Sequence, residues 1–404
     1  MEFLSDRLST DSSKVAVGSF GEALFNSDGL DNAFLTNFLT GRRIETNDKD
    51  RISERLVSST RAGGDLNLGL FGVAALNGIA GWKPYQLQWY TMAADRQHID
   101  VRFPPNLFEL AFYGNKRFAG DTAFLGDFEL NFLRYQEFQL GLITNNGKGR
   151  TLGLGLSVIK GEENWQIEVP NTTFFTSETG EFLEVSSQAS ILRTDTNNRG
   201  QTAVNGLGAS VNFFYKSHFT LLEHDRLGLG TIDFEVNNLG WISWNDQSIG
   251  YEIDTTYQFE GIVIDNLQEL NDSILQASSP DTLLDDLREK QNRQKYRTTL
   301  PTTFSLRIAQ EHSKGFSLAL GAIVRLQANY APYLFLSETY RVNRLLSVQG
   351  SAGYGGYGRW NAGVQCQLNP GNFRILIGTR HLNGWIAPKE YAGGSLYLTL
   401  KTVF

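Results

Sequence analysis

The sequence predicts an all-β protein, a transmembrane antiparallel β-barrel of about 14 strands, with 12 to 16 allowed. Segments in which apolar and polar residues alternate recur from near residue 14 to residue 404. No long helical layer is available to cover their apolar faces. Aromatic residues make up 12% of the chain, and several lie near the ends of these segments. Lipid would cover the apolar faces of such strands.

The alternation is clear in residues 317–330. Leu320 and Val324 lie on one face and Arg325 and Gln327 on the other, because successive strand side chains point to opposite sides. A half-buried soluble sheet gives the same pattern, so a soluble sandwich or β-helix is the alternative. Interfacial aromatic girdles, expected in a barrel, are predicted at Tyr85, Trp89, Tyr215, Tyr330, Trp360 and Tyr397.

We expect residues 1–404 to form one barrel domain, because composition marks no boundary. Neighbouring strand segments are expected either to merge into one long strand or to form hairpins outside the membrane. In chain order, strands are predicted near 13–26, 62–76, 83–97, 124–134, 136–146, 149–161, 164–173, 183–193, 204–216, 228–243, 247–262, 301–312, 315–330, 332–343, 345–354, 358–368, 372–381 and 394–404.

Three inserts interrupt this pattern. The segments 27–61 and 98–121 each contain a short helical pattern, the first capped by Asp31 or Asn32. The third, 264–298, contains a charged helix that is polar around its circumference. The first two inserts carry large apolar residues that are a liability in water, so we expect at least one of them to plug the barrel or cover its mouth. The plug candidates are Phe34, Phe38, Leu107, Leu110 and Phe112.

Bulk composition excludes several classes of protein. A net charge of -7 and a pI near 5.4 argue against a nucleic-acid binder. The single cysteine, Cys366, excludes an internal disulfide framework and a zinc cluster of thiolates. The sequence contains no run of 18 or more apolar residues, which excludes a membrane-spanning helix. The start, MEFLSDRLST, lacks a signal-peptide pattern, which suggests a cytosolic protein or a mature or trimmed form; the strands favour the latter.

No catalytic, metal or cofactor motif stands out. The five histidines, at 98, 218, 224, 312 and 381, have no metal-ligand spacing, and each is expected in a loop or at the barrel rim. No serine lies in a nucleophile-elbow pattern, and the glycine-rich stretches lack the features of a phosphate loop. We therefore expect no enzymatic activity, metal site or cofactor. An enzyme with its active site at the barrel rim is the third functional class considered, after the two given below.

The polar strand faces predict a charged lumen. Charges inside a barrel either pair to fill it or stay free to set selectivity. The rough balance of signs favours a mostly paired network. The predicted lumen-lining residues are Arg307, Arg325, Arg359, Arg374, Arg380, Glu129, Asp233 and Glu235.

The last strand, GGSLYLTLKTVF, alternates and ends on Phe404. It resembles the C-terminal recognition strand of Gram-negative outer-membrane barrels. This resemblance makes Phe404 the candidate assembly signal and implies a cleaved signal peptide and insertion by the barrel-assembly machinery. Together with FLTNFLTGRRI, LFELAFYGNKRFAGDTA and NGWIAPKEYAGG, the strand also resembles a poorly characterised family of Bacteroidota outer-membrane barrels. That family is loosely similar to barrels of the fatty-acid-transporter type, which carry an internal N-terminal plug.

The expected function is therefore that of an integral outer-membrane barrel, without enzymatic activity, that admits or transports a small or hydrophobic molecule and is plugged. The runner-up is a non-conducting barrel that serves as a subunit of an outer-membrane secretion or assembly complex. The expected partners are the lipid bilayer, the barrel-assembly machinery and, for the runner-up, proteins of that complex. No nucleic-acid partner is expected.

Overall fold

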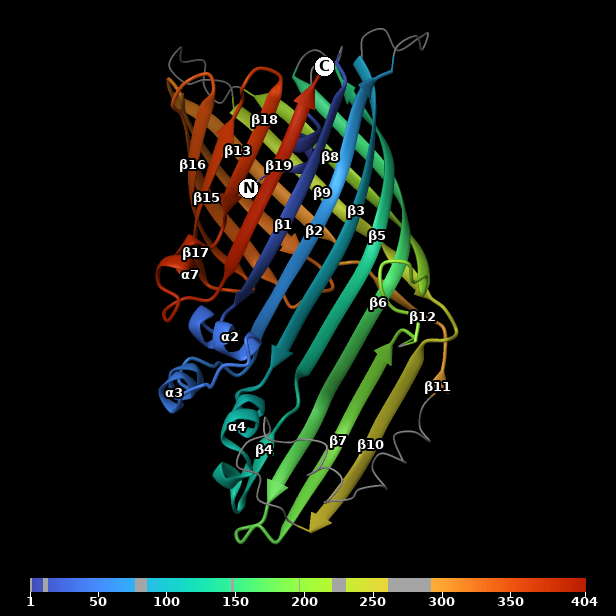
Figure 1. The fold of residues 1–404 in the computed structure, drawn as a ribbon, viewed down its shortest axis with the longest axis vertical. Helices are drawn as coiled ribbons and strands as arrows, with labels where there is room; N and C mark the ends of the chain where they lie inside the picture. Colours follow the sequence, from blue (N-terminus) through green and yellow to red (C-terminus); the bar gives the residue numbers. More distant parts are fainter. Residues whose placement is uncertain are drawn as a thin grey trace.

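The computed structural model describes residues 2–9, 14–76, 86–146, 149–195, 197–219, 230–260 and 292–404. Within these residues, fourteen antiparallel strands close into a barrel (Figure 1). Strand β1 pairs with β2 on one side and with β19 on the other, which joins the ends of the sheet. This confirms the predicted fold class and strand number. The barrel strands are β1 (Ala16–Ser27), β2 (Thr60–Ala75), β3 (Gln86–Phe103), β5 (Phe128–Asn145), β6 (Arg150–Thr176), β8 (Gly206–Phe219), β9 (Gly230–Trp244), β13 (Thr303–Ser313), β14 (Phe316–Arg325), β15 (Ala331–Arg341), β16 (Leu346–Gly356), β17 (Trp360–Leu368), β18 (Phe373–Thr379) and β19 (Gly394–Val403).

The outer wall of the barrel is apolar. On β6, Leu156 and Val158 are 62% and 65% exposed, whereas Ser157 between them is buried. On β14, Leu320 is exposed and Ala319 is buried. Alternate positions on other barrel strands show the same contrast, with leucine, isoleucine and aromatic residues outward. A wall of this kind is typical of a barrel that contacts lipid.

The aromatic girdle is only partly as predicted. Trp89 and Trp360 point outward and are exposed. Tyr397 instead is buried on the lumen face of β19, where its hydroxyl donates to Gln365. Tyr330 packs edge-on against Tyr357, with ring centroids 5.1 Å apart. The prediction was wrong for these two tyrosines because position near a strand end does not determine which face a side chain occupies. Tyr85 lies outside the described residues.

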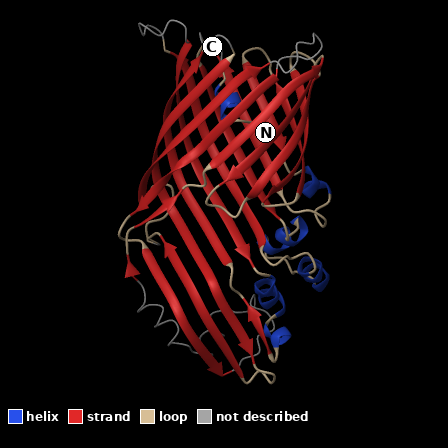
Figure 2. Cartoon of the chain, turned by 180° about the vertical axis from the view of Figure 1, so that it is seen from behind, coloured by secondary structure: helices blue, strands red, loops and turns tan. Residues whose placement is uncertain are grey.

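Strand β6 runs through the barrel and continues beyond it within the same sheet. Its residues 150–161 pair with β8 in the barrel, and its residues 165–176 pair with β7 (Phe182–Arg193) below it. Strand β10 (Ile249–Glu260) pairs with β7, and β4 (Asp121–Phe124) pairs with β6. These four segments form an extension sheet that projects past one end of the barrel (Figures 1 and 2).

The two predicted segments 149–161 and 164–173 are thus one strand. A bulge makes this possible: Arg134 of β5 pairs with Glu163, whereas the next residue, Tyr135, pairs with Gly161. The extra residue, Glu162, lets the strand bend and continue without ending. The predicted segments 124–134 and 136–146 likewise meet in β5, which runs unbroken from Phe128 to Asn145.

Short helices gather at the same end as the extension sheet (Figure 2). They are α2 (Asn32–Leu39), α3 (Thr46–Ser53), α4 (Pro105–Tyr113), the 3-10 helix η1 (Asn115–Phe118) and α7 (Leu382–Ile386). The side chain of Asp31 accepts a hydrogen bond from Phe34 N, so Asp31 caps α2. Strand β3 continues to Phe103, so the alternation does not stop at residue 98 as expected.

The charged helix predicted in the insert 264–298 lies outside the described residues as far as residue 291, after which the described residues resume. Two short strands follow, β11 (Asn292–Arg293) and β12 (Tyr296–Thr299). The remaining helix, α1 (Leu4–Leu8), lies within the barrel (Figure 2). No described helix is both long enough and apolar enough to cross a bilayer.

Candidate functional site in the barrel lumen

Residues 2–9, here called the lumen segment, occupy the inside of the barrel. Leu4 and Leu8 of α1 are buried against inward-facing side chains of the strands. Phe3 packs into a separate group on the other part of the wall, with Ile323, Tyr333 and Phe335. The strand residues around Leu4 and Leu8 include Phe20, Phe71, Val73, Tyr90, Met92, Ile143 and Phe214. The segment therefore fills space that barrel side chains alone leave open.

The start of α1 is held by two carboxylates of β9. Leu4 N and Ser5 N donate to the Glu235 carboxylate at 3.0 and 2.8 Å. The Ser5 hydroxyl donates to Asp233 at 3.2 Å. The first N–H groups of a helix have no partner within the helix, and no side chain of α1 caps them. Glu235 supplies the missing acceptors from the barrel wall.

The side chain of Asp6 lies between two cations. Its oxygens are 2.8 Å from Arg307 of β13 and 3.0 Å from Lys216 of β8. Arg307 also pairs with Asp233. Burial alone would raise the pKa of Asp6, but the charges of Arg307 and Lys216 outweigh it and hold the pKa well below its usual range. Asp6 is therefore ionised and fixes the segment to two strands.

The opposite side of the lumen segment is held by β18 and β19. Arg374 lies 3.3 Å from Glu2 and donates to the backbone carbonyl of Asp6 at 2.9 Å. Thr399 donates to Glu2, and Lys401 donates to the carbonyl of Arg7 at 3.2 Å. The segment thus spans the lumen from β8, β9 and β13 to β18 and β19, held at both sides by polar contacts.

A second polar cluster lies on neighbouring strands. His98 of β3 is buried, with Nδ1 2.8 Å from Asp65 and Nε2 3.1 Å from Asp100. Arg325 of β14 reaches across the lumen to Asp65 at 2.9 Å. The expectation that every histidine lies in a loop or at the rim was wrong for His98. The residue falls on the lumen face of β3 because that strand continues to Phe103.

Among the other histidines, His381 follows β18 and is buried. Burial, with a smaller effect from the charge of Arg380, lowers the pKa of His381 to about 3, so its ring is neutral at physiological pH. His312 is exposed and lies 2.9 Å from Glu338. His224 lies outside the described residues.

The structure brings together most of the predicted lumen-lining residues. Arg307, Asp233, Glu235 and Arg374 contact the lumen segment directly. Arg325 and Arg380 pair with Asp65 and Glu22 on neighbouring parts of the wall, the latter pair at 2.7 Å. Two predicted residues lie elsewhere. Arg359 is exposed in the turn between β16 and β17, and Glu129 pairs with Arg102 where β5 and β3 continue toward the extension sheet.

The plug candidates gather at the barrel end, beside the extension sheet, and not around the lumen segment. Phe34 of α2 packs against Phe112 and Phe108 of α4, with ring centroids 5.2 and 5.5 Å apart. Phe38 is half-exposed. Leu107 packs at the edge of this group, and Leu110 belongs to an adjacent one with Phe118 and Ala123. We call the group formed by Phe34, Ile44, Ile52, Phe103, Phe108 and Phe112 the rim cluster.

The lumen segment was not among the residues predicted to plug the barrel. Within residues 2–9 the only signal was the pair Leu4 and Leu8, four residues apart, with Asp6 and Arg7 between them. That spacing places both leucines on one face of a helix. A single turn of this kind is too short to distinguish from a mobile terminus by pattern alone.

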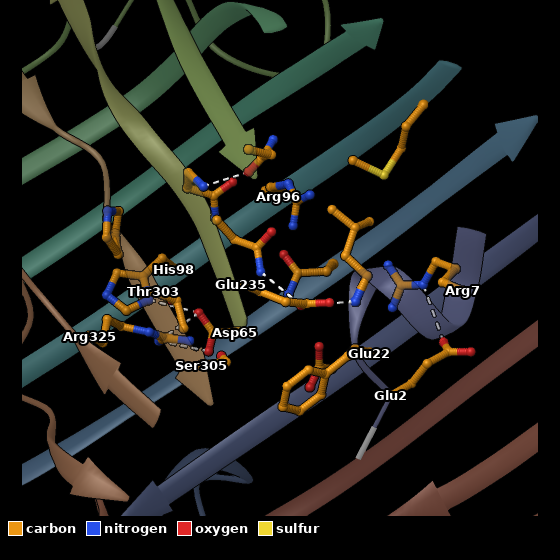
Figure 3. A pocket seen from close by; sticks show the side chains of 18 of the residues that line it. Glu2, Arg7, Glu22, Asp65, Arg96, His98, Glu235, Thr303, Ser305 and Arg325 are labelled. Carbon is orange, nitrogen blue, oxygen red and sulfur yellow. Dashed lines mark hydrogen bonds and ion pairs between the residues drawn. The ribbon is translucent and has the colours of Figure 1, made fainter. Parts of the chain in front are cut away.

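A cavity of about 170 Å³ lies beside the lumen segment (Figure 3). Glu2 and Arg7 of the segment form part of its wall, and Glu235, Ser305 and Arg325 project into it from the strands. Its surface is mainly polar. No group of three or more histidine, cysteine, aspartate or glutamate side chains suited to a metal ion occurs in the part of the chain that the structure describes.

The last strand places Phe404 at the barrel end opposite the helices. Its side chain is 71% exposed, and its backbone N–H donates to Val15 at 2.8 Å. The aromatic side chain is therefore accessible beyond the strand that closes the barrel. Cys366 is half-buried on β17 and has no disulfide partner among the described residues.

Several solved structures align with this chain over most of its length. The toluene transporter TodX of Pseudomonas putida aligns with 9% identity and a TM-score of 0.42, over 96% of this chain and 88% of TodX. A Pseudomonas aeruginosa FadL homologue aligns with 10% identity and a TM-score of 0.43, over 97% and 90%. The Ralstonia pickettii toluene transporter TbuX aligns with 7% identity and a TM-score of 0.41, over 97% and 89%.

At such identities these similarities do not assign a substrate. No curated protein matches this sequence. A family model described as a family of unknown function, DUF5723, matches residues 15–379, which include all of the barrel strands except β19. By this match, the chain belongs to the DUF5723 family.

Proposed function

We propose that the chain is an integral outer-membrane barrel that admits a small molecule, and that the lumen segment is the plug that closes it. The observation that carries the proposal is how the segment is held. Residues 2–9 cross the lumen, and beside the burial of Phe3, Leu4 and Leu8 they are anchored through ion pairs and hydrogen bonds to β8, β9, β13, β18 and β19. Water can replace such contacts one by one, which makes the closure reversible.

The wall supports the membrane location. Its exposed leucine, valine and isoleucine side chains would be unfavourable in water and are suited to lipid. The turns 314–315, 342–345 and 369–372 lie at the same end as the C-terminus, whereas the helices and the extension sheet lie at the other end (Figure 1). In outer-membrane barrels the short turns face the periplasm. We therefore orient the helices and the extension sheet toward the cell exterior.

Liposome swelling tests this proposal. Asp6→Asn combined with Glu235→Gln removes one anchor on the segment and one on the wall while keeping the side-chain shapes. The intact chain is expected to give slow swelling in a small neutral solute, and the double variant fast swelling. Ser347→Val, on the lumen side of β16 and away from the segment, is the control and should match the intact chain. Equally slow swelling of the double variant, with its barrel folded, would contradict the proposal.

The extension sheet supports a second candidate, a barrel subunit of a larger complex. The long strand β6 carries β7 and β10 beyond the membrane wall, which a simple pore does not require. One face of this sheet is acidic and exposed, with Glu168 on β6 and Glu252 and Asp254 on β10, on either side of β7. Affinity purification from native membranes tests this candidate. Stoichiometric co-purification of another protein, lost when the three acidic residues are changed to their amides, would support it.

A further inference from the structure

The charged groups around the lumen cavity are already paired. Asp65 is paired with Arg325, and Glu22 with Arg380. Arg96 lies 2.6 Å from Glu137 behind the cavity wall. Glu235 is occupied by the backbone N–H groups of the lumen segment. A ligand that carried a net charge would find no free opposite charge in this cavity, and entering would strip it of water without compensation.

Several neutral polar groups at the cavity have no such partner. The side chains of Asn67, Thr303 and Ser305 make no hydrogen bond to another residue in the described ranges. The Nε atoms of Arg325 and Arg380 are also buried without a hydrogen-bond partner in these ranges, although each guanidinium pairs with a carboxylate through one other nitrogen. Buried polar groups of this kind bind either water or a polar ligand. Thr303 and Ser305 project from one strand, β13, toward the cavity (Figure 3).

A bulge in β9 adds further amides to the cavity. Between Val211 and Phe213 of β8 the pairing skips two residues of β9, and one of these, Asn238, has a positive φ of 60°. Its backbone N–H donates to the Asn212 side chain at 2.6 Å. Both Asn237 and Asn238 border the cavity as a result. A non-glycine residue in this conformation is uncommon and is often found at a functional site.

We propose that this cavity binds a small neutral polyhydroxylated molecule, recognised by the free amide and hydroxyl groups of Asn67, Asn238, Thr303 and Ser305. The inference rests on the proposed function and names the class of molecule that the barrel admits. The volume of about 170 Å³ corresponds to roughly six water molecules, which is a suitable size for a triol or a single sugar ring. An apolar molecule of that size would leave these polar groups unpaired.

The position of the cavity also couples the ligand to the plug. Glu2, Phe3, Leu4 and Arg7 of the lumen segment form one side of it. A molecule that fills the cavity therefore touches both the wall and the segment. Binding favours whichever arrangement of the segment contacts the ligand better.

The test is equilibrium binding to the purified full-length barrel in detergent, with glycerol and glucose as probes. We expect saturable binding of at least one of them. Ser305→Val replaces the hydroxyl with a methyl group and adds a second methyl, and it should weaken binding about tenfold, the equivalent of one lost hydrogen bond. Ser347→Val makes the same change on β16, away from the cavity, and should leave binding unchanged. Heat-modifiable migration on gels verifies that each variant is folded.

Two comparison probes, sodium phosphate and toluene, test whether the cavity prefers an anion or an apolar molecule to a neutral polyol. Tighter binding of either one than of glycerol and glucose would overturn the proposal, as would equal glucose binding by Ser305→Val and the intact chain. Absence of saturable binding by both polyols would also overturn it. None of these outcomes bears on the proposal that the lumen segment is the plug, because liposome swelling with the Asp6→Asn, Glu235→Gln double variant is measured independently. If liposomes with that variant swell fast while no polyol binds, the proposal of a plugged barrel is retained and the proposed class of ligand is rejected.

Discussion

The short helices at the barrel rim and the single helix of the lumen segment bury apolar side chains in different ways. The rim cluster joins α2 and α4 through phenylalanine rings packed 4.5 to 5.5 Å apart, and α3 adds Ile52. The lumen segment buries Phe3, Leu4 and Leu8, but it is also held by ion pairs from both sides of the barrel. Rings packed against one another lose most of their contact when they separate, whereas a charged anchor that is released into water is rehydrated. The rim cluster is therefore suited to permanent structure and the lumen segment to movement.

The rim cluster should show the largest loss of stability. Phe34 is almost fully buried, so Phe34→Ala should destabilise the helices by about 3–5 kcal/mol. Hydrogen exchange of α2 and α4 measures this loss. Phe38→Ala, at a half-exposed ring on the same helix, is the matched control and should cost much less. Conductance of either variant should equal that of the intact chain; a steady pore in Phe34→Ala would instead make the rim cluster the plug.

The contact between the outer wall and lipid provides a reference for an interaction that does not depend on the plug. Leu320→Arg should cost about 2–4 kcal/mol if this residue lies near the middle of the membrane, because the guanidinium enters lipid. Ser317→Arg on the lumen side of the same strand should cost much less. Reversible unfolding in lipid measures both free energies. Similar costs at the two positions would contradict the assignment of the two faces.

Asp6→Asn should have a smaller effect on stability, confined to the lumen segment. The change removes the charge that pairs with Arg307 and Lys216 but retains a polar side chain, so we expect a loss of about 1–3 kcal/mol in anchoring. Labelling of Ser5→Cys in a Cys366→Ser background measures accessibility of the segment. The label should react faster when Asp6→Asn is added. An unchanged rate would show that the ion pair does not hold the segment.

Mild acid should have the smallest effect. The folded-state pKa of Asp6 is lowered, so its stabilising charge is present above its ordinary pKa of about 3.9 and is lost only as pH falls through the lowered value. Between pH 7 and pH 5 the labelling rate of Ser5→Cys, corrected for thiolate fraction, should therefore remain constant. A marked rise over this range would indicate that another group controls the segment.

The barrel could be predicted from the sequence because each strand repeats the same two-residue period. The wall pattern at Leu320 and Val324 needs no knowledge of other strands. The partners of the lumen segment could not be found in this way. Asp233, Glu235, Arg307 and Arg374 were predicted to face the lumen, but what they hold is a helical turn more than 200 residues away in the sequence.

The extension sheet and the plug candidates were harder for a related reason. The second half of β6 alternates as a barrel strand does, so periodicity does not reveal where the strand leaves the barrel. The insert phenylalanines, including Phe34 and Phe112, were recognised as too apolar for water. Their partners are one another, a possibility that composition does not distinguish from a place in the lumen. Whether the rim cluster also covers the barrel mouth stays a prediction.

Assembly through Phe404 also stays a prediction. Its aromatic side chain is exposed at the end of the closing strand. Deleting Phe404 should slow insertion in cells and leave unfolded protein in the periplasm. Pulse-chase analysis at native expression levels measures this. Normal amounts of folded barrel in the deletion variant would contradict a role as the assembly signal.

Planar-bilayer conductance of the chain with and without residues 2–9 tests the plug most directly. The intact chain should show little or no steady current, because the lumen segment spans the barrel between opposite walls. The deletion should give a larger, steady pore, while deletion of residues 105–118 at the rim should not. An intact chain that conducts as an open pore, or a deletion of residues 2–9 that stays closed in a folded barrel, would contradict the account.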